Sequence, residues 1–175
     1  MIIFSILVLL VSAGCSPSDT MNTAKPSSTQ TQQADKNQKS SANERATIGE
    51  MASIGDTSQT WEDEFGHPYA QGDTLKVYKN GQYKVVFVND RAVTITFPSA
   101  DGTEPAIDKM LPRDGSKQSE SNQKTGDITM TVEKWHSALL EKSIPDTKGM
   151  YTIMKNKNGE TYDSIVIDCT PNLKK

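Results

Sequence analysis

The sequence has few of the residues that build disulfide-linked or metal-stabilised folds. It contains two cysteines, Cys15 and Cys169, and two histidines, His67 and His136. Two cysteines cannot form the disulfide framework of a small secreted domain, and a zinc site needs several Cys or His ligands at close spacing. We therefore expect a fold that depends on its own core, with no metal ion and no other cofactor.

The chain also lacks an excess of positive charge and is poor in apolar residues. Its net charge is -3, which gives no positive field for nucleic acid, so we expect no nucleic-acid partner. Hydrophobic residues make up 34% of its 175 residues, which indicates that part of the chain lies outside any packed core.

No apolar run reaches the roughly 20 residues that span a bilayer. Residues 2–11 are apolar except for Ser5, and this length suits the hydrophobic region of a signal peptide. Small residues ending in Gly14 follow, and then Cys15. An N-terminal core helix with a buried cysteine is the alternative, but the stretch has no amphipathic period and no helix cap.

This arrangement resembles the lipobox of bacterial lipoproteins. The resemblance implies a signal peptide over residues 1–14, cleavage between Gly14 and Cys15, and a diacylglyceryl thioether on Cys15 that anchors the chain to the extracytoplasmic face of the cell membrane. The sequence departs from the family pattern at Ser12, where Leu is usual, and it has no Lys or Arg before the apolar run. The second departure leaves open whether the start codon lies upstream.

Residues 15–47 read as a lipidated cysteine followed by a tether. Ser, Thr, Gln, Asn and Lys dominate this segment, and it contains no aromatic residue. Such a composition cannot bury enough apolar surface to offset the entropy of ordering, so we expect disorder. A flexible chain of about 30 residues spans roughly 30 Å on average, which lifts a domain away from a membrane.

Residues 48–98 predict a helix and a three-stranded antiparallel meander. Thr57 is a plausible N-cap, Trp61 and Phe65 lie four residues apart on one helical face, and Gly66 ends the helix. Alternating apolar residues then predict strands that turn at Asn80-Gly81 and at Asn89-Asp90.

The stretch GDTSQTWEDEFGHP resembles the opening helix of the SmpA/BamE-like domain, which also occurs in β-lactamase inhibitor proteins. The matching positions are Gly55, Thr57, Trp61, Phe65, Gly66 and Pro68, and the resemblance covers about 50 residues. It implies a protein-binding surface rather than catalysis, and none of the matched residues carries over as a functional one.

Residues 103–172 predict a second α+β module. A helical turn before Pro112 precedes a polar stretch at 116–127 that we expect to be a loop, and then come strand, helix, strand, strand, with a turn at Asn158-Gly159. The fold class is thus α+β, with short helices packed on antiparallel β-meanders, as one or two small modules after a disordered tether. Whether the two modules share one sheet stays open.

The residue types that could carry chemistry have simple structural interpretations. Cys169 alternates with Ile165 and Ile167, which predicts a buried thiol on an apolar face. Trp61 and Trp135 are candidate binding residues, because aromatic side chains are favoured in binding hot spots; core burial is the alternative, and for Trp61 the pairing with Phe65 favours it.

Three functions follow from these observations. The first is a non-catalytic, lipid-anchored binding or accessory module that contacts an envelope protein. The second is a small-ligand-binding lipoprotein with a cleft between the modules. The third is an envelope hydrolase, which would require Asp101, Asp108, His136 and Asp168 to meet in a pocket. The sequence names no partner and no oligomeric state.

Overall fold

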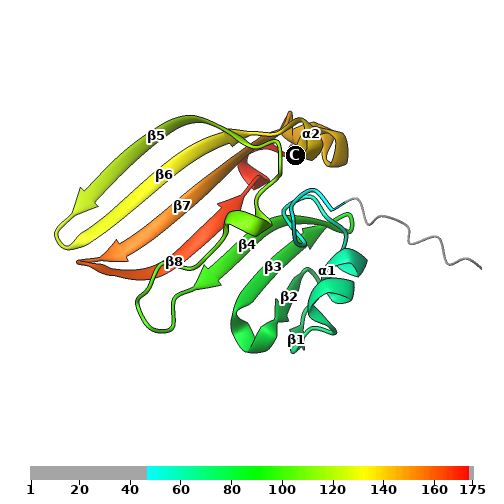
Figure 1. Ribbon diagram of the computed structural model, residues 1–175, viewed down its shortest axis with the longest axis horizontal. Coiled ribbons are helices and arrows are strands. Elements are labelled where there is room, and N and C mark those ends of the chain that lie inside the picture. Colours follow the sequence, from blue (N-terminus) through cyan, green and yellow to red (C-terminus); the bar gives the residue numbers. More distant parts are fainter. Residues whose placement is uncertain (1–46, 174–175) are drawn as a thin grey trace, which may run out of the picture. The chain divides into compact units, whose positions relative to one another are not determined.

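One antiparallel sheet organises the described part of the chain. The computed structural model describes residues 47–173, so the predicted signal peptide, Gly14 and Cys15 lie outside the described residues. The sheet has eight strands in the order β1-β2-β3-β4-β8-β7-β6-β5 and is accompanied by two short α-helices (Figure 1). Their bounds are β1 Ala70–Gln71, α1 Ser58–Phe65, β2 Leu75–Tyr78, β3 Tyr83–Val88, β4 Arg91–Pro98, β5 Ser116–Thr125, β6 Ile128–His136, α2 Ala138–Ser143, β7 Met150–Asn158 and β8 Thr161–Asp168.

Two consecutive meanders meet at their last strands. Strands β1 to β4 are neighbours in chain order, β5 to β8 are neighbours in chain order, and β4 pairs with β8. In that pairing Ile95 lies opposite Ile167 and Phe97 lies opposite Ile165. One sheet therefore runs through both predicted modules, which the sequence had left open.

Helix α1 begins and ends where the sequence predicted. The Thr57 side chain accepts a hydrogen bond from the backbone N–H of Thr60, and Gly66 follows the helix with a φ of 81°. Trp61 and Phe65 are buried, with their ring centroids 5.2 Å apart. The Trp61 ring also lies 5.6 Å from that of Tyr78 on β2, so the helix presents its aromatic residues to the sheet.

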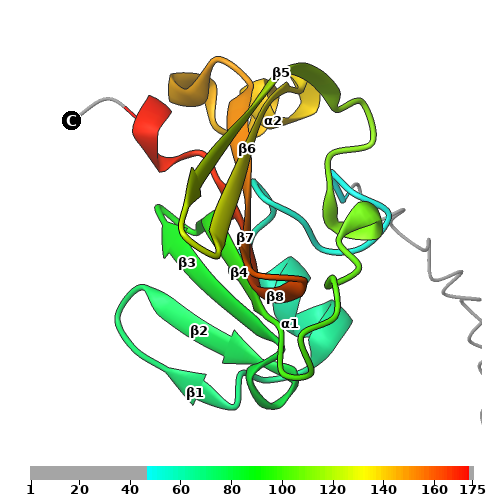
Figure 2. The ribbon, with the colours of Figure 1, turned by 90° about the vertical axis from the view of Figure 1, so that its left-hand side faces the viewer.

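A buried carboxylate organises the segment that precedes α1. Asp56 accepts hydrogen bonds from the backbone N–H groups of Ile48 and Ser53 at 3.1 and 2.8 Å. Burial raises the pKa of Asp56, although these bonds and the charges of Arg91 and Arg113 oppose the shift. Figure 2 shows α1 and the segment with the short 3-10 helix Asp108–Met110 on the same side of the sheet.

The polar loop predicted at 116–127 is wrong, because most of this segment is strand β5. The ten residues of β5 are all exposed and include no apolar side chain, so the sequence has no hydrophobic alternation that would predict a strand here. The ladder with β6 and the turn at Gly126-Asp127 fix its conformation. A further strand, the two-residue β1, also carries no periodic signal.

The two turns predicted in the first meander are present. Asn89 and Asp90 form a two-residue turn between Val88 and Arg91, with φ values of 50° and 60°. Asn80-Gly81 lies in a longer turn, since the flanking pair is Tyr78 and Tyr83.

The prediction for Cys169 is confirmed. Its side chain is fully buried with Ile165 and Ile167, and burial together with the charge of Asp168 raises the pKa of the thiol to about 12. The thiol therefore stays protonated at neutral pH, as expected of a small core residue.

Two glycines offer a matched test of the packing between α2 and β7. Both have positive φ, 71° at Gly149 and 62° at Gly126. A Cβ at Gly149 would clash with the carbonyl oxygen of Ser137, whereas a Cβ at Gly126 meets nothing within 4 Å. We expect G126A to lower the free energy of unfolding by about 1 kcal/mol through backbone strain alone. G149A should lower it by about 3 kcal/mol, because it adds a clash with backbone. Urea unfolding of both variants measures the difference, and equal losses would contradict this account of Gly149.

Candidate functional site

A charged cleft opens between strands β5 to β7 and the segment that joins β4 to β5. Its volume is about 480 Å³, and we call it the charged cleft because it combines an apolar floor with side chains of both charges. The lining residues are Glu104, Pro105, Ala106, Ile107, Asp108, Leu111, Lys117, Glu133, Trp135, Ile153 and Lys155.

Strand register brings the charged residues together. Glu133 and Trp135 are two residues apart on β6, so both project from the same face of the sheet. Glu133 lies opposite Ile153 on β7, and Trp135 lies opposite Lys117 on β5. Lys155 follows Ile153 by two residues and shares this face, so three neighbouring strands supply the floor and walls.

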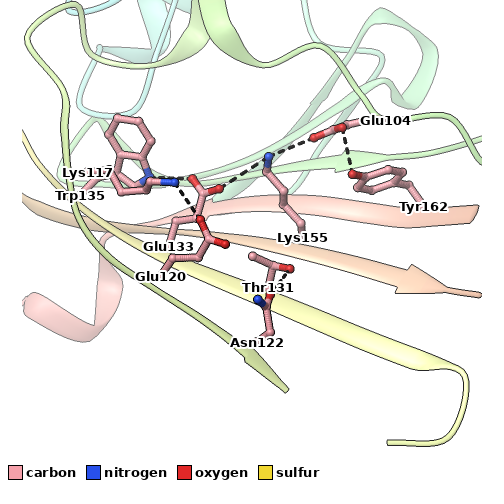
Figure 3. A network of polar contacts seen from close by, with 9 residues as sticks. All are labelled: Glu104, Lys117, Glu120, Asn122, Thr131, Glu133, Trp135, Lys155 and Tyr162. Carbon is pink, nitrogen blue, oxygen red and sulfur yellow. Dashed lines mark hydrogen bonds and ion pairs between the residues drawn. The ribbon is translucent and has the colours of Figure 1, made fainter. Parts of the chain in front are cut away.

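Ion pairs and hydrogen bonds connect the residues of the cleft (Figure 3). The Trp135 indole N–H donates to Glu133 Oε2 at 2.9 Å. The Lys155 ammonium lies 3.7 Å from the other oxygen of Glu133 and 3.0 Å from Glu104 Oε1. The Tyr162 hydroxyl donates to Glu104 Oε2 at 2.9 Å. Lys155 thus links a carboxylate of the sheet to a carboxylate of the covering segment.

Glu133 is the most deeply placed charge of this network. Its side chain is only 11% exposed, whereas that of Glu104 is 46% exposed. A buried carboxylate is unfavourable unless it is paired and hydrogen-bonded. Trp135 and Lys155 provide those partners, so the position of Glu133 depends on the side chains around it.

The network favours the charged forms of Glu104 and Lys155. The hydrogen bond from Lys155 holds the pKa of Glu104 below its usual range. Burial alone would lower the pKa of Lys155, but the hydrogen bond to Glu104 and the charge of Glu133 outweigh it and raise that pKa. Both side chains are therefore ionised at neutral pH. A general acid needs a carboxyl pKa that is raised, and the pKa of Glu104 is shifted in the opposite direction.

A second hollow of about 450 Å³ adjoins the charged cleft. Trp135, Asp108 and Leu111 line both hollows, and the second adds Glu50 and Arg113. The half-buried Trp135 side chain therefore forms a wall common to both hollows. The centroid of its ring lies 6.2 Å from that of the Tyr151 ring.

The sequence-predicted candidates lie in different places. Trp135 lines the charged cleft, whereas Trp61 is fully buried in the core, the alternative that its pairing with Phe65 had favoured. Cys15 and Gly14 lie outside the described residues.

The structure does not bring together the four residues that the hydrolase hypothesis required, Asp101, Asp108, His136 and Asp168. Asp108 lines the cleft, and Asp101 is bonded to Thr103 at a turn. His136 and Asp168 alternate with Trp135 and Ile167 along their strands, so they project from the opposite face of the sheet.

Sequence reasoning did not select Glu104, Lys117, Glu133 or Lys155 as candidate site residues. Alternation along β6 was a usable signal, because it places Glu133 beside Trp135 on one face. The other three come from segments far apart in the chain, and only the strand register brings them together.

Comparisons with protein-family models, with curated proteins and with solved structures found no match. Within residues 47–173, no three His, Cys, Asp or Glu side chains are grouped so as to hold a metal ion. No helix in the same range is long and apolar enough to cross a bilayer.

The link between Lys155 and Glu104 predicts a pH effect. Replacing Lys155 with Met removes the donor that lowers the pKa of Glu104, so this pKa should rise toward its ordinary range. In the unaltered protein the pair contributes stability above the unfolded-state pKa of Glu104, and this contribution is lost as the pH falls through the lower folded-state value. NMR titration of the Glu104 carboxyl measures the shift. K157M is the control, because the direct effect of Lys157 on the pKa of Glu104 comes from its charge, without a hydrogen bond to that carboxylate. A shift at least as large in K157M as in K155M would refute the assignment.

Proposed function

We propose that the protein is a lipid-anchored, extracytoplasmic lipoprotein that acts as a non-catalytic protein-binding or accessory module at the bacterial cell envelope. The charged cleft beside Trp135 is the observation that carries the binding role. We place the docking site for an envelope protein in this cleft and the membrane anchor at Cys15.

The anchor is supported by the sequence before the described residues. An apolar run too short to span a bilayer is followed by small residues and Cys15, as in the bacterial lipobox. Two acyl chains on one cysteine hold a protein firmly at a membrane, since each buried methylene contributes roughly 0.8 kcal/mol.

The binding role is supported by the chemistry of the cleft. Trp135 supplies a large, partly exposed aromatic surface, and aromatic residues dominate binding hot spots. Ile107, Leu111 and Ile153 add apolar wall, while Lys117 and Glu104 place both charges at its border. We expect a partner segment that rests an apolar side chain against Trp135 and carries charges complementary to this border.

The finer interpretation of the fold belongs to the same proposal. We interpret the two short helices as packing on antiparallel meanders, as one or two small modules after a disordered tether over residues 15–47. The resemblance of the α1 segment to SmpA/BamE-like domains is consistent with a protein partner.

A small-ligand-binding role is the second candidate. Its supporting observation is the volume of the cleft, about 480 Å³, because ligand pockets range from about 300 to 1,000 Å³. This cleft lies within residues 103–172 rather than between the two predicted modules. The adjoining hollow of about 450 Å³ is lined by both ranges, since Glu50 belongs to the first and Arg113 to the second. Another hollow lined by both ranges, which includes Val93 and Ile144, is about 240 Å³.

The anchor can be tested at Cys15. We expect C15S to release the protein into the medium or to leave an unprocessed precursor, since serine offers no thiol for lipidation. Cell fractionation and metabolic labelling with a fatty acid measure the effect. C169S is the matched control, because that thiol is buried in the core and should not affect labelling. An unchanged, labelled membrane fraction in C15S would reject the anchor.

The docking site can be tested by photocrosslinking in intact cells. A photoreactive residue in place of Lys117, at the border of the cleft, should link to one envelope protein, which mass spectrometry identifies. The same residue in place of Lys84 should not, because Lys84 is an exposed residue of β3 outside the cleft.

A second substitution shows whether such a link depends on the cleft. Adding W135A should weaken the Lys117 link about tenfold or more, as for a hot-spot residue, whereas W135F should keep most of it. If no crosslinked protein is found at position 117, or if W135A leaves the amount of the crosslink unchanged, the result would favour the small-ligand role.

A further inference from the structure

Strand β5 leaves one edge of the sheet open along its whole length. It is the terminal strand of the sheet and pairs only with β6 (Figure 1). All ten of its residues are exposed, whereas β1 at the opposite edge has only two residues. An exposed edge offers unpaired backbone N–H and C=O groups to another strand.

The hairpin register determines which backbone groups face outward. Thr125 and Ile128 flank the two-residue turn, so their backbone groups bond to each other across the hairpin. Because bonded and non-bonded positions alternate along an antiparallel strand, Gln123 and Ser121 also face β6. Glu120, Asn122 and Lys124 therefore direct their N–H and C=O groups to the open edge.

The side chains of these three residues share one face. They lie opposite Glu133, Thr131 and Thr129 of β6, which places them on the face that carries the charged cleft. Thr131 donates a hydrogen bond to Asn122 Oδ1 at 2.6 Å, and Lys117 pairs with Glu120 at 2.7 Å. Along the open edge, every second residue from Glu120 to Lys124 therefore lies on this face, and the three side chains are a carboxylate, an amide and an ammonium in that order.

We propose that β5 is a self-association edge, at which a second copy of this chain pairs antiparallel about a two-fold axis through Asn122. In an antiparallel pair, the side chains of residues directly opposite each other lie on the same face of the sheet. The two-fold axis must therefore pass through a residue, and it cannot pass between two residues. A symmetric pair centred on Glu120 would place two carboxylates opposite each other, which is unfavourable. A pair centred on Ser121 would leave Glu120 opposite an asparagine.

The register centred on Asn122 matches every charge of this stretch. Glu120 then lies opposite Lys124 of the partner subunit, and Lys124 lies opposite the partner subunit's Glu120. The two Asn122 residues meet at the axis, and all three positions have backbone groups free for the new ladder. This self-complementarity is the reason to choose a second copy over an unrelated strand as the occupant.

The same features keep the association limited. The irregularity between Lys117 and Ser119 interrupts the strand, so regular pairing is confined to its second half. Such a contact is smaller than a standard stable interface, and we expect a weak, reversible dimer. The charges that oppose the register centred on Glu120 also protect the edge from indiscriminate pairing.

Cysteine scanning of the full chain in intact cells tests the register. Residues opposite each other at a bonded position have Cα atoms about 5.5 Å apart, within the range of a disulfide. We expect N122C to give an interchain disulfide dimer on non-reducing gels after mild oxidation, about tenfold above S121C, Q123C and the parent chain, which reports any background from Cys15 and Cys169. A strongest dimer at S121C would overturn the register. No dimer above the parent at any of the three positions would overturn self-association.

A charge exchange separates specific pairing from random collision. In the N122C chain, E120K should reduce the dimer roughly tenfold, because it replaces two attractive cross-strand pairs with two repulsive ones. Adding K124E to E120K restores opposite charges at both positions and should restore the dimer. An unchanged amount of disulfide dimer in E120K, or no recovery of the dimer when K124E is added, would overturn the proposal. Protein abundance in the same cells shows whether each variant folds.

Discussion

The pairing of β4 with β8 is the constraint on which the rest of the structure depends. It joins the last strands of two meanders through Ile95, Ile167, Phe97 and Ile165, all of which are buried. Each meander alone would be a small sheet with a limited apolar face, and small cores are marginal. Their union gives one continuous apolar surface at the centre of the sheet, which the aromatic residues of α1 and the segment around Asp56 cover from one side.

This central core determines where polar surface is allowed. Toward β1 and β2, the rings of Trp61, Phe65 and Tyr78 extend the core. Toward β6 and β5, the same face changes from apolar to charged, because Ile153 lies opposite Glu133, and Glu133 lies opposite Glu120. The covering segment crosses this transition at Glu104 and Leu111, and the charged cleft forms there. The cleft thus lies at the border between the packed and the solvated parts of one sheet face.

Sequence reasoning succeeded where local chemistry decides the structure. The cap at Thr57, the helical pair Trp61 and Phe65, and the turn at Asn89-Asp90 all depend on residues a few positions apart. It failed for β5, because a strand of exposed polar residues has no hydrophobic alternation and is specified by its neighbour β6. It missed most of the cleft for a related reason, since Lys155 and Glu104 are about 50 residues apart in the chain and meet only through the register of β7 and the path of the covering segment.

The network around Lys155 orients charges beside an aromatic ring, a feature that stability alone does not require. A buried ion pair rarely stabilises a protein more than apolar residues of the same size would, because desolvation offsets the attraction. Trp135 could have packed against an apolar neighbour, yet its indole N–H is bonded to Glu133. Holding a carboxylate and an ammonium in fixed positions beside a half-exposed aromatic ring gives a surface whose charges are already oriented. A partner that meets this surface loses less entropy on binding than one that must order flexible side chains.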